Sequence, residues 1–321
     1  MLTSDDGFLV VIAALAFDAV IGDPDWLWRR APHPVVWIGR AIGFLERRLN
    51  RESWPPLSRK LAGVATVIVL VSAAVLIGGL VEDLFDPGLF GVVVKGLLAA
   101  VLIAQRSLYQ HVARVHRAFG DGGLAAARQA VAMIVGRDPE RLDSAGVARA
   151  AVESAAENFS DGVVAPVFWL ALLGLPGLIA YKAINTADSM IGHRSPRYQD
   201  FGWAAARLDD LVNLAPARLT GLLIALVAPV GGGSIATSLR LMLRDAGKHR
   251  SPNAGWPESA MAGALGIALA GPRAYAEGVV NDPLLNAEGR IAAPDDIRRA
   301  LRILVAACAL QFAIYAALAL P

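Results

Sequence analysis

The stretch LAGVATVIVLVSAAVLIGGLV, residues 61–81, carries no charged residue and decides the fold class of this chain. A bilayer crossing needs about 20 mostly apolar residues in an α-helix, so this segment is predicted to span a membrane. The whole sequence of 321 residues has the same character, because 55% of it is hydrophobic and only 18% is charged. Soluble proteins carry about 25% charged residues. We therefore expect an all-α, polytopic integral membrane helix bundle that forms a single domain over residues 1–321.

Other apolar runs extend this bundle. Three of them are predicted to be further spans, of which the first is shorter: residues 8–22, 89–104 and 301–320. Three more are interrupted or short, and we expect them to be re-entrant or short helices: residues 163–181 around GLPG, residues 219–233 ending in APVGGG, and residues 260–272. A broken helix at membrane depth is tolerated where the break is buried in protein. Two additional full crossings are the alternative.

The distribution of Lys and Arg predicts the orientation, because cytoplasmic loops are enriched in both. Residues 23–60 and 106–160 are basic, whereas the short loop 82–88 is acidic. Residues 182–218 are basic again, which conflicts with a full crossing by 163–181 and favours a segment that returns to the same side. We expect a multi-pass protein of the cell membrane with these basic segments, and residues 235–258, in the cytoplasm.

Two classes of site are excluded by composition. The formal net charge of +2 and the lack of a basic arm argue against nucleic acid as a partner. Cys308 is the only cysteine, so the chain forms no internal disulfide and no cysteine metal site. His33, in HPVVWIG, is interpreted as a residue that orders a loop rather than as a ligand.

The stretch AVESAAENFSDGVVAPVFW, residues 151–169, places carboxylates against an apolar run. Read as a helix, Glu153, Glu157 and Asp161 are four residues apart and share one face with Arg149, and Asn158 lies beside them. The plain alternative is a solvated helix face that ends in a Ser-Asp-Gly turn. Carboxylates close to a membrane are unfavourable unless they are paired or used, so a functional site is the competing interpretation.

Similar polar clusters follow at segment ends. They are carried by YKAINTADSMIGHRSPRY, by FGWAAARLDDLVNLAPARL and by RDAGKHRSPNAGWPESAMAGALG. Carboxylate and amide oxygens suit Mg²⁺, which usually binds one or two carboxylates together with substrate phosphates. Arginine and lysine suit anionic groups of a substrate. The small residues in AMAGALG predict close helix packing.

These motifs, together with GDPDWLWRRAPHPVVWIGRAI at residues 22–42, resemble the cobinamide-phosphate synthase family of cobalamin biosynthesis, the membrane proteins called CobD or CbiB. The resemblance covers most of the chain in the family's order. It implies a C–N ligase that joins a propionate of adenosylcobyric acid to aminopropanol or to its O-phosphate. ATP is the expected cosubstrate and Mg²⁺ the expected metal ion. Further candidate partners are the lipid bilayer, other cobalamin-biosynthesis enzymes and a second copy of the chain.

The resemblance also suggests roles for individual residues, in a pocket at the cytoplasmic edge of the membrane. The expected catalytic residues are Glu157, Asp161, Asp188 and His193, with a carboxylate or His193 taking the proton of the amine. The expected metal ligands are Glu157, Asp161, Asp209 and Asp210. The expected substrate-binding residues are Glu153, Asn158, Lys182, Asn185, Arg194, Arg207, Asn213, Arg218, His249 and Asn253.

Two rival functions stay open on the sequence. A prenyltransferase would also use Asp-rich helix faces with Mg²⁺, but the Asp209–Asp210 pair precedes LVNLAPAR rather than a repeated Asp-rich motif. A corrinoid transporter or scaffold would also use broken helices and charges within the membrane. Transport residues belong near the middle of the bilayer, whereas these clusters lie at segment ends.

Overall fold

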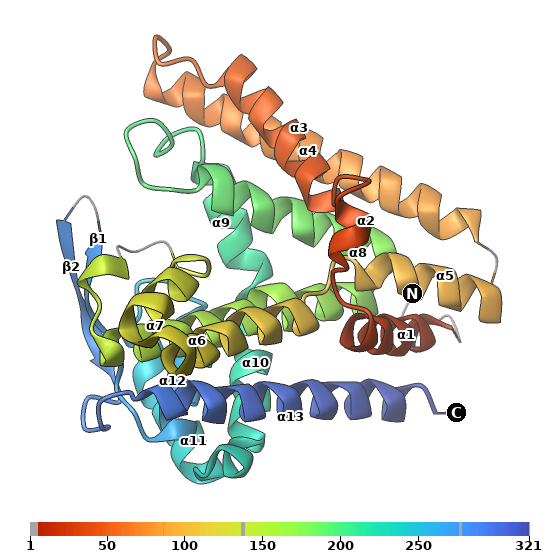
Figure 1. Cartoon of the computed structure of the whole chain (residues 1–321). Coiled ribbons are helices and arrows are strands. Elements are labelled where there is room, and N and C mark those ends of the chain that lie inside the picture. The colour runs from red at the N-terminus through yellow and green to blue at the C-terminus, as the bar shows by residue number, and fades with distance from the viewer. Residues whose placement is uncertain (1–5, 86, 136–138, 276–277, 321) are drawn as a thin grey trace. The chain divides into compact units, whose positions relative to one another are not determined.

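The structure, a computed structural model, describes residues 6–85, 87–135, 139–275 and 278–320 (Figure 1). It is mostly helical, which confirms the predicted all-α class, and one β-hairpin is added to the helices. The chain divides into two compact units. The first unit contains Met1–Ala104, Ala165–Asn213 and Tyr315–Pro321, and the second contains Gln105–Val164 and Leu214–Ile314.

The first unit is built around a long helix, α4 (Pro56–Leu84), that packs against α8 (Ala165–Ile191). Its other helices are α1 (Gly7–Val20), α2 (Asp25–Trp28), α3 (Pro34–Leu49), α5 (Leu89–Ala100) and α9 (Trp203–Val212). One hydrophobic cluster joins α3, α4, α8 and α9 and includes Ile42, Val67, Ile191 and Phe201. His33 forms the N-cap of α3 and its Nε2 lies 3.1 Å from the carbonyl oxygen of Val101, so it orders a loop as predicted.

The second unit surrounds α12 (Gly255–Leu265), which is buried along most of its length. The neighbouring elements are α6 (Gln105–Ala132), η1 (Pro139–Arg141), α7 (Ser144–Phe159), the π-helix η2 (Ser160–Val164), α10 (Leu214–Leu226), η3 (Ala228–Gly231), α11 (Ile235–Asp245), η4 (Ala246–Lys248) and most of α13 (Pro294–Leu318).

Small residues allow close packing of α11 and α12. A Cβ atom on Gly263 would lie 2.7 Å from Cα of Ser238, so only glycine allows α11 and α12 to approach this closely. The small residues therefore serve helix packing, as predicted.

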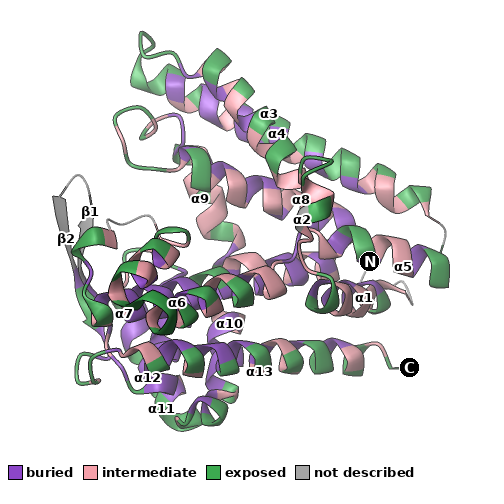
Figure 2. Cartoon of the chain, in the orientation of Figure 1, coloured by how far each residue is buried: buried purple, intermediate pink, exposed green. Residues whose placement is uncertain are grey.

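Four helical segments of the described residues are long and apolar enough to cross a membrane: Pro56–Leu84, Leu89–Ala132, Ser144–Ile191 and Pro294–Leu318. Only 28% of the apolar window in α4 is buried inside the protein. Leu76 and Leu80 are 66% and 72% exposed, and Figure 2 shows exposed positions along the whole of α4. Large exposed apolar surfaces mark membrane or protein contacts. The helices indicate a multi-pass membrane protein.

The predicted interruption in residues 163–181 is present. Gly174 has φ 68° and ψ −156°, outside the helical region, and Pro176 follows two residues later. A Cβ atom on Gly78 of α4 would lie 2.5 Å from Cα of Pro176, which places the broken part of α8 directly against α4. The break supports the predicted broken helix, and the return of the chain to the same side of the membrane stays a prediction.

The sequence analysis missed the hairpin. The run 260–272 is not one short helix, because α12 ends at Leu265 and Gly266 adopts φ 67°. Strand β1 (Leu269–Tyr275) then pairs antiparallel with β2 (Gly278–Leu285). The second strand ends at Leu285, and α13 starts at Pro294. A two-stranded ribbon depends on its partner strand rather than on a strong local pattern.

Candidate functional site

The polar side chains of α8 and α9 face each other at the end of α8. Asn185 donates a hydrogen bond from Nδ2 to Oδ1 of Asp209, at 3.3 Å. Asn213, which is 1% exposed, donates from Nδ2 to Oδ2 of Asp209 at 3.0 Å and accepts from the hydroxyl of Tyr181 at 3.0 Å. Tyr181, Asn185 and Asp188 are three or four residues apart, so they share one face of α8. Two amides thus hold the Asp209 carboxylate in place.

Burial raises the proton affinity of the two carboxylates on α9. Burial, followed by the negative charge of Asp188, raises the pKa of Asp209 from 3.8 to about 7, although the hydrogen bonds from the two amides oppose this. Burial also raises the pKa of Asp210, against the opposing charges of Arg207 and Arg194. Asp209 is therefore able to accept and release a proton near neutral pH, which suits a general base.

Cationic side chains border the carboxylates. Nη1 of Arg207 lies 3.5 Å from Oδ2 of Asp210, and both groups reach solvent. Arg194 and His193 are exposed in the loop after α8, and His193 is close enough to Asp188 for a favourable charge interaction. Lys182 is half-buried on α8. An anionic group that approaches this end of α8 would therefore meet positive charge next to a carboxylate base.

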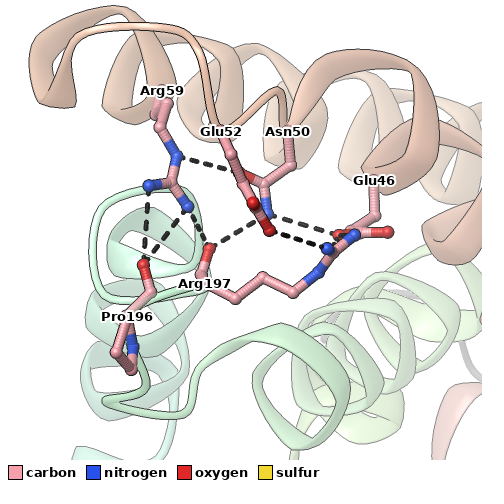
Figure 3. Close-up of polar contacts among 6 residues, drawn as sticks. All are labelled: Glu46, Asn50, Glu52, Arg59, Pro196 and Arg197. Carbon is pink, nitrogen blue, oxygen red and sulfur yellow. Dashed lines mark hydrogen bonds and ion pairs between the residues drawn. The ribbon is translucent and has the colours of Figure 1, made fainter.

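A network of hydrogen bonds fixes the loop 192–202, which carries His193 and Arg194, against α3 and α4 (Figure 3). Arg197 donates from Nε and Nη2 to Oε1 of Glu46, at 2.9 Å and 2.6 Å. Asn50 donates to the carbonyl oxygen of Arg197 at 3.1 Å. Arg59, 8% exposed, donates to the side chain of Asn50 and to the backbone carbonyls of Pro196 and Arg197. The loop is held by both its side chains and its backbone.

Gly192 is required by this arrangement. Its backbone N–H donates to the carbonyl of Asp188 at 2.7 Å and ends α8. A Cβ atom at this position would lie 1.9 Å from Oδ1 of Asp188. Real Cβ atoms do not approach an oxygen this closely, so the side chain of Asp188 keeps its position only because residue 192 is glycine.

In the second unit, the carboxylates of the stretch 151–169 have different surroundings. Oε1 of Glu153 accepts a hydrogen bond from the backbone N–H of Ala270 at 2.7 Å and lies 3.8 Å from Nε of Arg149. Glu153 is 3% exposed, so the shared face is not uniformly solvated. Glu157 and Asn158 are exposed, and Nδ2 of Asn158 donates to the carbonyl of Ser154 at 2.8 Å.

Asp161 lies in the π-helix η2, half-buried, between α7 and the first residue of α8. The structure therefore continues as helix where the plain interpretation expected a Ser-Asp-Gly turn that ends the helix. Short π-helical segments inside α-helices are frequent at functional sites. This is an independent reason to test Asp161.

The remaining predicted residues gather around the start of α12, also in the second unit. Nδ1 of His249 accepts from the backbone N–H of Ser251 at 3.0 Å, and its Nε2 lies 3.7 Å from Oε1 of Glu258. The guanidinium of Arg218 lies over the ring of Trp256, 4.4 Å from its centroid. Asn253 is 7% exposed, and its backbone N–H donates to the hydroxyl of Ser251 at 3.2 Å.

The predicted residues thus fall into two sets. The set in the first unit is brought together on α8, the following loop and α9: Lys182, Asn185, Asp188, His193, Arg194, Arg207, Asp209, Asp210 and Asn213. The set in the second unit comprises Glu153, Glu157, Asn158, Asp161, Arg218, His249 and Asn253. That the two sets form one pocket stays a prediction. Among the described residues, no group of three His, Cys, Asp or Glu side chains is placed to hold a metal ion.

Sequence reasoning missed the residues that position the site. Glu46, Asn50 and Arg59 lie outside the quoted motifs, and Tyr181 opens the stretch YKAINTADSMIGHRSPRY without a role having been predicted for it. Arg197 in SPRY was visible only as one more basic residue, and its carboxylate partner is 151 residues away.

The chain matches the profile of the CobD/Cbib protein family over residues 11–304. A cobalamin biosynthesis protein CobD from Sinorhizobium sp is 51% identical over 321 residues, which cover 99% of both chains. The protein of that name from Brucella suis biovar 1 is 52% identical and covers 91% of each chain, and that from Rhodobacter capsulatus is 51% identical over 92% of this chain and 91% of its own. No solved structure matches significantly. With a family profile that covers most of the chain and relatives this similar over nearly their full length, the chain belongs to the CobD/Cbib family.

Proposed function

We propose that this chain is a membrane-bound amide-forming ligase of cobalamin biosynthesis. It joins a propionate of adenosylcobyric acid to 1-amino-2-propanol or to its O-phosphate, and the product is adenosylcobinamide or its phosphate. Two observations support the assignment: membership of a family whose relatives are named cobalamin biosynthesis protein CobD, and a carboxylate base on α9 next to cationic side chains.

The observation that carries the proposal is the environment of Asp209. The amine nucleophile is protonated in water at neutral pH and must lose a proton before it can attack a carbonyl. A base with a pKa of about 7 is well matched to this task, and burial beside Asp188 supplies that value at Asp209. The negative charge of Asp188 also attracts the ammonium form of the substrate, which brings its proton toward Asp209.

Amide formation needs an activated carboxyl group, since a free carboxylate is a poor acyl donor. In the proposed sequence, an oxygen of the propionate attacks the terminal phosphorus of ATP and ADP leaves. Asp209 takes one proton of the ammonium, the amine nitrogen attacks the carbonyl carbon of the acyl phosphate, and inorganic phosphate leaves with the second proton of the nitrogen. Arg194 and Arg207 are the residues that would hold the phosphate oxygens, because guanidinium groups bind phosphate with paired hydrogen bonds.

Mg²⁺ is proposed to enter with the nucleotide. It would neutralise charge on the phosphates, and it usually needs only one or two protein carboxylates in such a site. The placement of Asp209 in α9, outside the candidate spans, supports an enzyme rather than a transporter.

The test uses the full chain purified in detergent. Adenosylcobyric acid and Mg-ATP are supplied with each amine in turn, and the amide product is detected by mass spectrometry. We expect product with one of the two amines, loss of product without ATP or Mg²⁺, and loss in Asp209→Asn. Asp200→Asn, which changes another carboxylate of the same unit, is the matched control. No product with either amine would disprove the proposal, and release of diphosphate from a prenyl substrate would favour the rival transferase.

A further inference from the structure

The outward face of α3 is aromatic and cationic. The inward face carries Ile42, which is fully buried, and Ile38 and Leu45, which pack on the hydrophobic cluster of the first unit. On the outward face, Trp37 is 57% exposed and Phe44 is 53% exposed. Figure 2 shows exposed positions along α3. Two large aromatic rings are thus exposed on one face of α3, although neither packs into the core of the unit.

Each of these rings is covered by an arginine from the same helix. The guanidinium of Arg40 lies 5.2 Å from the centre of the Trp37 ring, and that of Arg48 lies 5.4 Å from the centre of the Phe44 ring. The pattern begins on α2, where the guanidinium of Arg30 lies 5.9 Å from the Trp26 ring. We call these six residues the aromatic–arginine surface. Aromatic rings favour the boundary between the lipid headgroups and the acyl chains, and arginine binds the phosphate of the headgroups. Helices that lie at a membrane interface combine these two kinds of side chain.

The charge of this region is not balanced by its own acidic residues. Residues 23–60 contain eight Lys and Arg and four acidic residues, Asp23, Asp25, Glu46 and Glu52. Both glutamates are engaged by Arg197 from the loop after α8, and Asp23 lies 3.6 Å from Nε2 of His33. The arginines of the aromatic–arginine surface therefore present positive charge outward.

The position of the surface along the first unit is set by one contact and by one short connection to apolar segments. His33, at the corner between α2 and α3, lies 3.1 Å from the carbonyl of Val101, directly after the end of α5. At its other end, α3 is followed within seven residues by Pro56, the first residue of the candidate span α4. The aromatic–arginine surface is therefore tied to the ends of apolar segments, the level at which headgroups lie.

We propose that the aromatic–arginine surface binds anionic phospholipid headgroups, with Trp26, Trp37 and Phe44 at the acyl boundary and Arg30, Arg40 and Arg48 on phosphate oxygens. The helix α3 is then an interfacial element of the membrane domain. Each additional Lys or Arg near an anionic leaflet strengthens the binding of a protein to that leaflet. A guanidinium group also forms two parallel hydrogen bonds with a phosphate.

The first test measures lipid affinity of the full chain. Delipidated protein in detergent is titrated with phosphatidylglycerol or with phosphatidylcholine of the same acyl chains, and bound lipid is counted by native mass spectrometry. For Arg30→Gln/Arg40→Gln/Arg48→Gln we expect phosphatidylglycerol affinity to fall about 100-fold, about fivefold for each arginine, with phosphatidylcholine binding unchanged. The matched control changes three exposed arginines of the second unit, Arg114→Gln/Arg117→Gln/Arg240→Gln. Equal losses in both triple variants would overturn the proposal, because the effect would then be general charge.

A second measurement does not depend on these variants. Ala41, exposed between Trp37 and Arg48, is changed to Cys in a Cys308→Ser background and spin-labelled in vesicles that contain phosphatidylglycerol. We expect the label to be reached by oxygen and shielded from a water-soluble nickel reagent, unlike a label at Glu140, whose side chain is 77% exposed. A label as accessible to water as that at 140, or one broadened by a second copy of the chain, would refute the proposal.

Discussion

Arg197 donates two hydrogen bonds to a single oxygen of Glu46, at 2.9 Å and 2.6 Å, and these two residues are 151 positions apart in the sequence. The side chain of Glu46 is 8% exposed, whereas the other partner of Arg197, Glu52, is 73% exposed. Arg197 thus binds one buried and one exposed carboxylate. Mutating each glutamate in turn compares a buried with an exposed contact of the same arginine.

We expect Glu46→Gln to lower the free energy of unfolding of the first unit by about 1.5–3 kcal/mol, the usual worth of a hydrogen bond to a charged group. Glu52→Gln removes a solvent-screened pair and should change it by less than about 1 kcal/mol. Thermal melts in detergent compare the two variants. Because the loop also carries Arg194, Glu46→Gln should weaken nucleotide binding as well. Equal melting temperatures in both variants would contradict the structural role of Glu46.

Asp209 predicts a pH dependence of both stability and activity. Its pKa is raised from 3.8 to about 7, so between these values the folded state holds a proton that the unfolded state has released. Stability from this group is therefore greatest at low pH and falls as the pH rises from about 4 to about 7. Asp209→Asn should lack this fall, so the melting temperatures of wild type and variant should be closest near pH 4 and should separate by pH 8, with that of the wild type the lower.

The activity should change in the opposite direction. A base must be ionised to take a proton, so turnover should rise with an apparent pKa of about 7. Asp200→Asn should keep this profile. A wild-type rate that is flat from pH 5.5 to pH 8 would show that Asp209 is not the base.

Gly192→Ala should reduce activity and also lower the melting temperature, because the new Cβ atom would lie 2.7 Å from the backbone carbonyl oxygen of Asp188. The new Cβ atom would lie 1.9 Å from Oδ1 of Asp188 and force that carboxylate aside. A displacement of about 1 Å in a catalytic arrangement costs on the order of 10²-fold in rate. Gly79→Ala is the control, since nothing lies within 4 Å of the added atom. It should stabilise α4 by about 0.5–1 kcal/mol. The kcat/KM of both variants is measured beside their melting temperatures, and full activity in Gly192→Ala would mean that Asp188 need not be held in place.

The stretch 151–169 offers a direct choice between a site and a helix face. If Glu157 and Asp161 contact metal or amine, Glu157→Gln and Asp161→Asn should each lower the rate by about 10²- to 10³-fold. On a solvated face each change costs less than about 1 kcal/mol of stability and little activity. We expect Asp161 to be the more sensitive residue, because it is half-buried in the π-helix whereas Glu157 is exposed.

Glu153→Gln provides the contrast for these two variants. Its carboxylate is bonded to the backbone N–H of Ala270, so the change should act mainly on melting temperature. Normal turnover in both Glu157→Gln and Asp161→Asn at saturating substrate would assign the whole stretch to structure.

The predicted orientation is tested by labelling from outside. Gln199→Cys and Gly247→Cys, introduced separately without Cys308, lie in two basic segments predicted to be cytoplasmic, and both positions are exposed. An impermeant maleimide should label them only after cells are opened. Efficient labelling of intact cells would mean that the broken segment 163–181 crosses the membrane fully.

Local sequence determined much of this protein. The uncharged run 61–81 is sufficient for a helix because each residue satisfies its backbone hydrogen bonds within the segment, and the structure extends it to Pro56–Leu84. Gly174 and Pro176 break α8 for reasons that are equally local, namely a positive φ and a missing N–H. The polar residues of α8 and α9 were recognisable because carboxylates and amides near an apolar segment need partners or a role.

Tertiary structure alone decided how those residues behave. The pKa of Asp209 depends on its burial and on the charge of Asp188, which lies 21 positions earlier in the sequence. The sequence of the Asp209–Asp210 pair shows neither this burial nor the proximity of Asp188. Glu153 and Glu157 occupy the same predicted face, yet one is buried against Ala270 and the other is exposed. Arg197 was one basic residue among several until the fold placed Glu46 beside it. Helix periodicity sets which side chains share a face, but the free energy of a charge depends on how much water and which opposite charge surround it, and only the packed chain supplies both.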